Sequence, residues 1–175
     1  MDGTALGVMA AEIINWTGKI LTFPKGLLAD VFKRPEMSKI GIYFLVGPTQ
    51  DLSDNVLVYV GKSDNIGVRL KDHDVDLDKE FCEQIAVFIS KDDNLTIGHA
   101  SYLEARLISI IKSASSEKLQ NANKGSLVSF PESEVSDMEY VISQLRVLMP
   151  VLGFSFMQEL PAPKGKAAVF TWQRK

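Results

Sequence analysis

The pattern of apolar and polar residues predicts an antiparallel hairpin near the middle of the chain. Residues 40–46 and 56–60 form two almost continuous apolar runs, and a glycine follows each run. Such runs are typical of strands that are covered on both faces. The connection, residues 47–55, is rich in Pro, Asp, Ser and Asn, as expected of a solvent-facing loop.

The two tyrosines of these runs are expected on one face of the hairpin. Pairing Val46 with Val56 places Tyr43 opposite Tyr59, and the alternation of strand side chains puts both rings on the same side. Core packing is the usual role of aromatic residues in such strands. A further apolar run at 84–89 predicts a third strand.

Helical spacing of apolar residues predicts the segments between and after the strands. Residues 63–65 can cap a helix that runs to about Asp72. A longer helix is expected from about Thr96, because six apolar residues recur at helical period: Ile97, Ala100, Leu103, Leu107, Ile108 and Ile111. Another helix is expected at 134–149, where Pro150 should stop it. The apolar residues 151–156 then predict a short strand or a docked tail.

The N-terminal part is expected to be a β/α extension. Residues 8–16 and 20–23 are strand-like, and Pro24 opens a predicted short helix through Phe32. The pattern divides the chain into an N-terminal extension packed on the core at 1–39, a core at 40–126, a C-terminal helical extension at 127–160 and a loose tail at 161–175.

Composition favours one globular domain in a reducing compartment. The chain has 175 residues, of which 46% are hydrophobic and 23% charged. Cys82 is the only cysteine, so an intramolecular disulfide is excluded and a cytoplasmic location is expected. No apolar run approaches the ~18–20 residues that cross a bilayer, so no membrane partner is expected.

The charge distribution is uneven. The net charge of −3 argues against a nucleic-acid binder, but the acidic residues are concentrated at 72–83 and 132–139. The rest of the chain carries a net charge of +6, so a basic face that meets phosphates remains an alternative to ordinary solvated charges.

Three charged side chains stand out chemically. Glu104 lies within the apolar stripe of its helix, four residues after Ala100 and three before Leu107. A carboxylate there needs a basic partner or a bound cation, and both interpretations stay open. Arg69 and His73 are four residues apart and so project from one helix face; they suit phosphate binding and proton transfer, or form an ordinary surface pair.

Taken together, these residues resemble the GIY-YIG nuclease family. The triplet Gly41-Ile42-Tyr43 is followed by Tyr59-Val60-Gly61, with Val in the middle of the second triplet. The remaining matches follow in the family's order: Lys62, Arg69, His73, the helical Glu104 and a late asparagine, Asn121, with Asn123 as its rival. The resemblance covers about residues 40–123. This core is similar to the nuclease module of bacterial excision-repair endonucleases. Residues 12–19 and 148–154 resemble an uncharacterised bacterial subgroup of the family.

The resemblance implies an α+β fold, a small three-stranded antiparallel sheet flanked by helices, with an N-terminal β/α extension and a C-terminal helix. It also implies a metal-dependent endonuclease that hydrolyses DNA phosphodiester bonds. Glu104 would bind one Mg²⁺ or Mn²⁺ ion, and Arg69 would stabilise charge on the phosphoryl oxygens. The site would lie on the sheet face that bears Tyr43 and Tyr59.

The family pattern implies a role for each remaining residue. Tyr43 would activate the attacking water, which requires a nearby cation, Lys62 or the metal, to lower its pKa from ~10. Tyr59 would orient the water or the phosphate, and His73 would assist proton transfer. Lys62 and Asn121 would contact the substrate, although Asn121 would serve equally well as a bond to the scaffold.

Two other interpretations stay open. In the first, the chain is a catalytically weak or inactive GIY-YIG-like module that binds nucleic acid or a partner protein. In the second, it is a subunit that is active only in an assembly, as a homodimer or in a larger complex. The full set of motif residues favours activity, whereas the acidity of 72–83 beside the expected site favours the alternatives.

Overall fold

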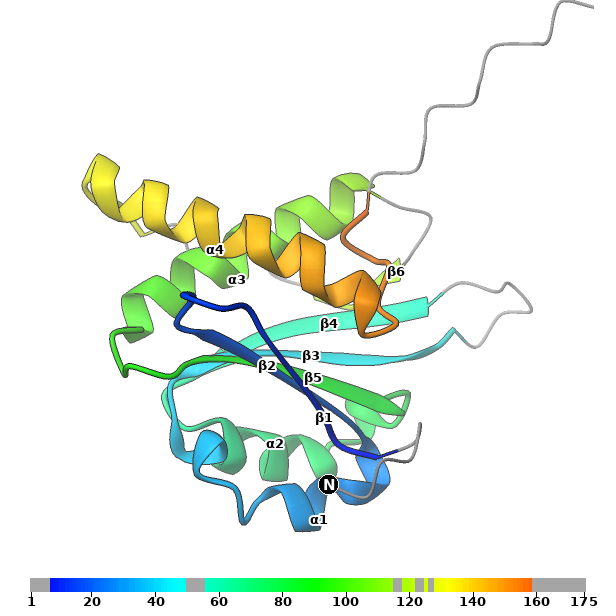
Figure 1. The fold of residues 1–175 in the computed structure, drawn as a ribbon. Helices are drawn as coiled ribbons and strands as arrows, with labels where there is room; N and C mark the ends of the chain where they lie inside the picture. Colours follow the sequence, from blue (N-terminus) through cyan, green and yellow to red (C-terminus); the bar gives the residue numbers. More distant parts are fainter. Residues whose placement is uncertain (1–6, 50–55, 115–117, 122–124, 126–127, 159–175) are drawn as a thin grey trace, which may run out of the picture.

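The computed structural model describes residues 7–49, 56–114, 118–121, 125 and 128–158. The fold is α+β, as predicted, with one sheet between two layers of helices (Figure 1). One face of the sheet carries α3 (Ile97–Ala114) and α4 (Glu132–Val151), and the other carries α1 (Leu28–Val31) and α2 (Ile66–Asp74). Short 3₁₀ turns cover Lys25–Leu27, Pro35–Ser38 and Leu77–Lys79.

The sheet is larger than the three strands expected. The order of the strands in the sheet is β1-β2-β5-β3-β4-β6. Neighbouring strands pair antiparallel, except that β6 pairs parallel to β4. The strands are β1 (Met9–Glu12), β2 (Gly18–Pro24), β3 (Gly41–Pro48), β4 (Val56–Ser63), β5 (Gln84–Ser90) and β6 (Lys118–Leu119). The three predicted strands are β3, β4 and β5, at the centre.

The N-terminal hairpin joins this sheet edge to edge. β2 pairs with β5 along its whole length, from Gly18 opposite Ser90 to Pro24 opposite Gln84. An isolated two-stranded hairpin is at best marginally stable in water, so pairing with the free edge of β5 stabilises both strands. The prediction of a three-stranded sheet was wrong because it treated this hairpin as separate from the sheet.

The register of the central hairpin differs from the predicted one by two residues. Tyr43 lies opposite Gly61, and Tyr59 lies opposite Leu45. β3 continues to Pro48, beyond the expected end of the strand, and this moves the pairing. Because side chains alternate with a period of two, the shift keeps both tyrosines on one face, as predicted, with ring centroids 6.2 Å apart.

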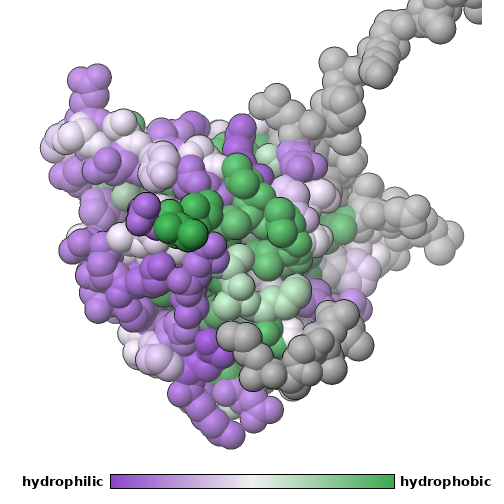
Figure 2. All heavy atoms as spheres, in the orientation of Figure 1, coloured by the Kyte–Doolittle hydropathy of each residue, from purple (hydrophilic) through white to green (hydrophobic). Residues whose placement is uncertain are grey.

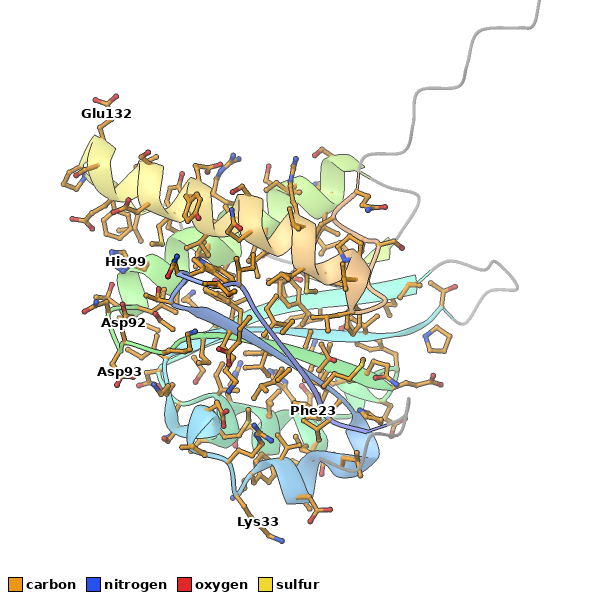
Figure 3. The ribbon with its side chains drawn as sticks, in the orientation of Figure 1. Phe23, Lys33, Asp92, Asp93, His99 and Glu132 are labelled. Atoms are coloured by element: carbon orange, nitrogen blue, oxygen red, sulfur yellow. The ribbon has the colours of Figure 1, made fainter. Side chains whose placement is uncertain are left out.

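Apolar side chains fill both layers between sheet and helices. Phe44, Val58 and Val60 pack under α3 and α4. On the other face, Phe23 and Leu45 pack toward α1 and α2, and Phe23 lies in this lower layer (Figure 3). Burial on both faces explains why the central strands are almost continuously apolar.

The ends of the helices follow local signals. The Asn65 side chain accepts a hydrogen bond from the Val68 N–H and so caps α2, as predicted. α4 includes Pro150 in its last turn, so the expected stop at this residue was premature. Gly153 ends α4 with a φ of 93°. Phe154, the next residue, is buried. Of the two predictions for this segment, a short strand or a docked tail, the structure shows the docked tail. The predicted loose tail, 161–175, lies outside the described residues.

Within the described residues, none of the helices has the length and apolar character needed to cross a membrane.

Candidate functional site

Four of the predicted site residues meet on the face of the sheet that carries α2. β3 supplies Tyr43, β4 supplies Tyr59, and α2 supplies Arg69 and His73. The His73 ring centroid is 5.4 Å from that of Tyr43 and 5.6 Å from that of Tyr59. Arg69 and His73 therefore lie on one side of α2, as their spacing predicted.

The second triplet ends in glycine for a steric reason. Tyr43 extends across β4 at Gly61, and a Cβ atom at Gly61 would overlap the Tyr43 ring and hydroxyl. The absence of a side chain there lets the phenol reach His73.

A hydrogen bond connects Tyr43 to His73. The Tyr43 oxygen is 2.7 Å from Nε2 of His73, and both residues are buried, at 1% and 6% exposure. Nδ1 of His73 faces the Asp76 carboxylate at 3.7 Å. This arrangement fits a neutral imidazole that carries its proton on Nδ1 and accepts the phenol proton at Nε2.

The electrostatic environment keeps this pair neutral. Burial, and then the neighbouring Tyr59, raises the pKa of Tyr43 well above its ordinary value. Burial, and then the positive charges of Arg69 and Lys79, lowers the pKa of His73, which Asp76 opposes. Tyr43 is therefore the donor at neutral pH, and it is not the acidified phenol that the sequence analysis required.

The cation beside Tyr43 is Arg69 and not Lys62. A hydrogen bond to Tyr43 raises the pKa of Arg69, and the Arg69 side chain is 45% exposed. Its Nη1 atom is 4.0 Å from the Asp72 carboxylate. Asp72 beside Arg69 and Asp76 beside His73 place part of the acidic segment directly at the site.

Lys62 and Glu104 lie on the opposite face of the sheet. Side chains alternate along β4, so Lys62 points to the α3 side, as Val58 and Val60 do. Its Nζ atom is 2.5 Å from Oε2 of Glu104, and these side chains are 28% and 13% exposed. Of the two interpretations of Glu104, the structure shows the basic partner. The expectation of one site on a single sheet face is wrong, because the residues divide between both faces of β4.

The residues present can hold a metal ion in one restricted way. The described residues contain no group of three or more His, Cys, Asp and Glu side chains that could bind a metal. Glu104 is a single, partly exposed carboxylate, and its bond to Lys62 uses Oε2. Mg²⁺ is often held by one carboxylate, with water and substrate phosphate as further ligands, so Glu104 fits that limited role.

Asn121 bonds to the scaffold. Its side-chain oxygen accepts the Val60 N–H at 2.9 Å, and its side-chain nitrogen donates to the Val60 carbonyl at 2.8 Å. These two bonds continue, through a side chain, the pairing that β6 makes with β4 at Val58. The rival, Asn123, lies outside the described residues.

Lys79 is a site residue that sequence reasoning did not single out. Its Nζ atom lies 3.9 Å from the centre of the Tyr59 ring and donates to Oε1 of Gln120 at 3.0 Å. Gln120 in turn donates to the backbone carbonyl of Asp78 at 2.6 Å. Burial lowers the pKa of Lys79. The one available signal was that Lys79 is the only lysine or arginine between the acidic residues 72 and 83.

Both halves of the site adjoin one stretch of β4, from Tyr59 to Lys62. Tyr59 and Lys62 are three residues apart on this strand and point to opposite faces, and Asn121 contacts the edge at Val60 between them. In the described residues, β6 pairs with β4 only at Leu57 and Val58. Cationic side chains therefore lie on both sides of this part of β4, Lys79 and Arg69 on one face and Lys62 on the other.

No family model matches the chain, and neither a curated protein nor a solved structure matches it.

Proposed function

We propose that this protein is a metal-dependent endonuclease that hydrolyses DNA phosphodiester bonds with a GIY-YIG type site. One observation carries the proposal: the buried bond from Tyr43 to His73, which sits beside the partly exposed guanidinium of Arg69. A neutral proton acceptor next to a fixed cation is what attack of water on a phosphate diester requires. The ordered motif residues support this reaction class.

The proposed reaction uses Tyr43 and His73 as a proton relay. A water molecule gives a proton to the phenol oxygen of Tyr43 as the phenol proton passes to Nε2 of His73. The water oxygen attacks phosphorus, the bond to the leaving oxygen breaks, and that oxygen takes a proton from solvent. The imidazolium formed at His73 faces the carboxylate of Asp76, which stabilises its charge.

The cationic side chains bind and stabilise the phosphate. Arg69 can donate two parallel hydrogen bonds to phosphoryl oxygens as their charge increases. Lys79 lies over the ring of Tyr59 and adds positive charge on the same face. Lys62 contributes from the opposite face. A Mg²⁺ or Mn²⁺ ion held by Glu104 would supply further stabilisation of charge on the phosphate and leaving oxygens.

The second candidate function is a catalytically weak or inactive module that binds nucleic acid or a partner protein. The bond between Lys62 and Glu104 favours this alternative, because Lys62 already neutralises the proposed metal ligand. The carboxylates of Asp72 and Asp76 favour it as well, since they face Arg69 and His73 where a phosphate would bind.

Nicking of supercoiled plasmid at low salt with Mg²⁺ or Mn²⁺ tests the proposal. We expect metal-dependent nicking by the wild type and a loss of at least about 100-fold in Glu104→Gln, because this change removes the metal-binding carboxylate. Glu139→Gln is the matched control: Glu139 is also a helical glutamate in a contact between elements, bonded to Arg106 at 2.5 Å, but it lies on α4.

The outcomes separate the two candidate functions. Nicking that survives in Glu104→Gln, or that falls equally in Glu139→Gln, would contradict the assigned site. Absence of nicking by a folded wild type that still binds DNA would support the binding module.

A further inference from the structure

The outer edge of β1 is open, and an apolar surface borders it. β1 pairs with β2 alone among the described strands, so the backbone groups on its other edge have no partner strand. Figure 2 shows that apolar side chains gather on the side where β1 is the foremost strand and α4 crosses above it (Figure 1). We name the outer edge of β1 and the exposed side of α4 the β1/α4 face. β1 and the residues just after it contribute Met9 and Ile14, which are 40% and 89% exposed, and α4 contributes Tyr140, Val147 and Val151, at 55%, 61% and 79%.

The β1/α4 face lacks the features that keep strand edges from pairing. β1 has the sequence Met-Ala-Ala-Glu, without the lysine or proline that often protects an edge. Its charged residue, Glu12, forms ion pairs with Lys19 at 3.1 Å and Lys91 at 2.9 Å. From Tyr140 to Val151, the α4 positions on this side are also uncharged: Tyr140, Gln144, Val147, Leu148 and Val151. The carboxylate of Asp137, one turn earlier, lies at the margin of the face, where it lines a cavity with Asn15 and Tyr140.

We propose that a second copy of this chain docks on the β1/α4 face, with the two β1 strands pairing antiparallel across a two-fold axis. A two-fold axis perpendicular to the sheet places identical strand edges antiparallel, which is the geometry in which each satisfies the other's free backbone groups. Ala10 and Ala11, at the middle of β1, are small enough to let the edges approach closely. The two sheets would join into one continuous sheet.

The size and charge of the face favour a second copy over a single peptide strand. A stable interface buries about 800 Å² per partner, a patch about 30 Å across, and α4 with its 20 residues is about 30 Å long. A peptide added to β1 would leave the exposed part of α4 uncovered. A second copy brings its own α4, so apolar residues meet apolar residues, and neither side contributes an unpaired charge from β1.

This dimer is independent of the proposed nuclease activity. β1 is at one end of the strand order, and β4 with its candidate site is near the other end. The interface would therefore leave both copies of the candidate site uncovered, at the outer ends of the joined sheet.

Sedimentation velocity over a range of protein concentrations tests the proposal. In a concentration series of the wild type that extends to about 100 µM, we expect a species with twice the 19.4 kDa mass of the chain. Ala10→Lys and Val151→Lys should each raise the dimer dissociation constant at least tenfold, because they put an unpaired charge into the interface. Leu77→Lys is the matched control, since Leu77 is 78% exposed, close to the 79% of Val151, but lies after α2.

Hydrogen exchange separates strand pairing from any other mode of association. The amides of β1 should exchange more slowly at concentrations where the dimer forms, and circular dichroism should show that each variant is folded. A monomeric wild type at the highest concentration overturns the proposal. A dimer that Leu77→Lys weakens as much as Val151→Lys, or one that leaves β1 exchange unchanged, overturns it too.

Discussion

The most unusual single residue is His73, a buried histidine held in its neutral form. Its ring is enclosed by Tyr43 and Tyr59, and burial together with two nearby cations lowers its pKa. The sequence predicted its position on α2 and its proximity to Arg69. It did not predict its burial, because that depends on Tyr43 reaching across Gly61, a contact between residues distant in sequence.

The lowered pKa of His73 predicts how stability depends on pH. Since the unfolded chain binds the imidazole proton more readily than the folded chain, this contribution is present above the ordinary value of 6.5 and is lost as the pH falls below it. We expect the free energy of unfolding to fall from pH 7 to pH 5 by less in His73→Gln than in the wild type, measured by urea denaturation. Equal pH dependence in the two proteins would contradict this assignment.

The lowered pKa of His73 also predicts how the rate of nicking depends on pH on the acid side. The relay needs neutral His73, so the rate should hold down to a pH below 6.5 and then fall as the imidazole is protonated. His73→Gln should lose most of the activity at every pH. His99→Gln changes the only other histidine, which is bonded to Glu134, and should keep the wild-type rate.

At the scale of elements, the sequence predicted what depends on local pattern. The strands at 40–46, 56–60 and 84–89 and the helix from Thr96 all lie where expected, because long apolar runs and stripes have few alternatives. The pairing partners of the strands and their register were harder to predict from the sequence. Which edge the N-terminal hairpin joins, and how far β3 extends, depend on contacts between distant segments that no local pattern contains.

The end of α4 shows how a local prediction can fail for a local reason. Pro150 lacks the N–H group that would donate to the carbonyl four residues earlier, yet α4 continues to Val151, and the signal that ends the helix is Gly153. The Gly153 N–H donates to the Pro150 carbonyl, and the Phe154 N–H donates to the Met149 carbonyl. These bonds satisfy carbonyls at the helix end and require the positive φ that glycine adopts easily.

A matched pair of glycine substitutions tests this cap. Gly153→Ala should lower the free energy of unfolding by about 1 kcal/mol, because alanine is strained at a φ of 93°. Gly26→Ala is the control: at both glycines an added Cβ would meet nothing within 4 Å, but Gly26 has no positive φ. Guanidinium denaturation of both variants measures the difference. Equal effects would mean that the backbone strain at Gly153 is not what ends α4.

At the scale of the molecule, the balance of charge decides how DNA could approach. The chain has a net charge of −3, yet the candidate site contains Arg69, Lys79 and Lys62. Salt reduces interactions between exposed charges beyond about 10 Å at 0.1 M, so the acidic groups that matter are those next to the site. Asp72 and Asp76 meet this condition through their contacts with Arg69 and His73.

Removing these two charges should therefore strengthen DNA binding. In a Glu104→Gln background with EDTA, we expect the double variant Asp72→Asn/Asp76→Asn to bind a short duplex about three- to tenfold more tightly at low salt, measured by fluorescence anisotropy. The gain should shrink as salt rises, because it comes from relief of repulsion at the phosphates.

The control variant changes the net charge of the protein by the same amount, but at positions distant from the candidate site. Glu132→Gln/Asp137→Asn removes two carboxylates from α4, where Glu132 lies at the outer end of the helix (Figure 3). If both double variants gained equally, only net charge would be acting, and DNA would not be bound beside α2. A gain confined to the Asp72 and Asp76 variant would place the phosphates beside Arg69. The acidic segment 72–83 would then act as a local barrier that limits binding to DNA able to displace it from the site.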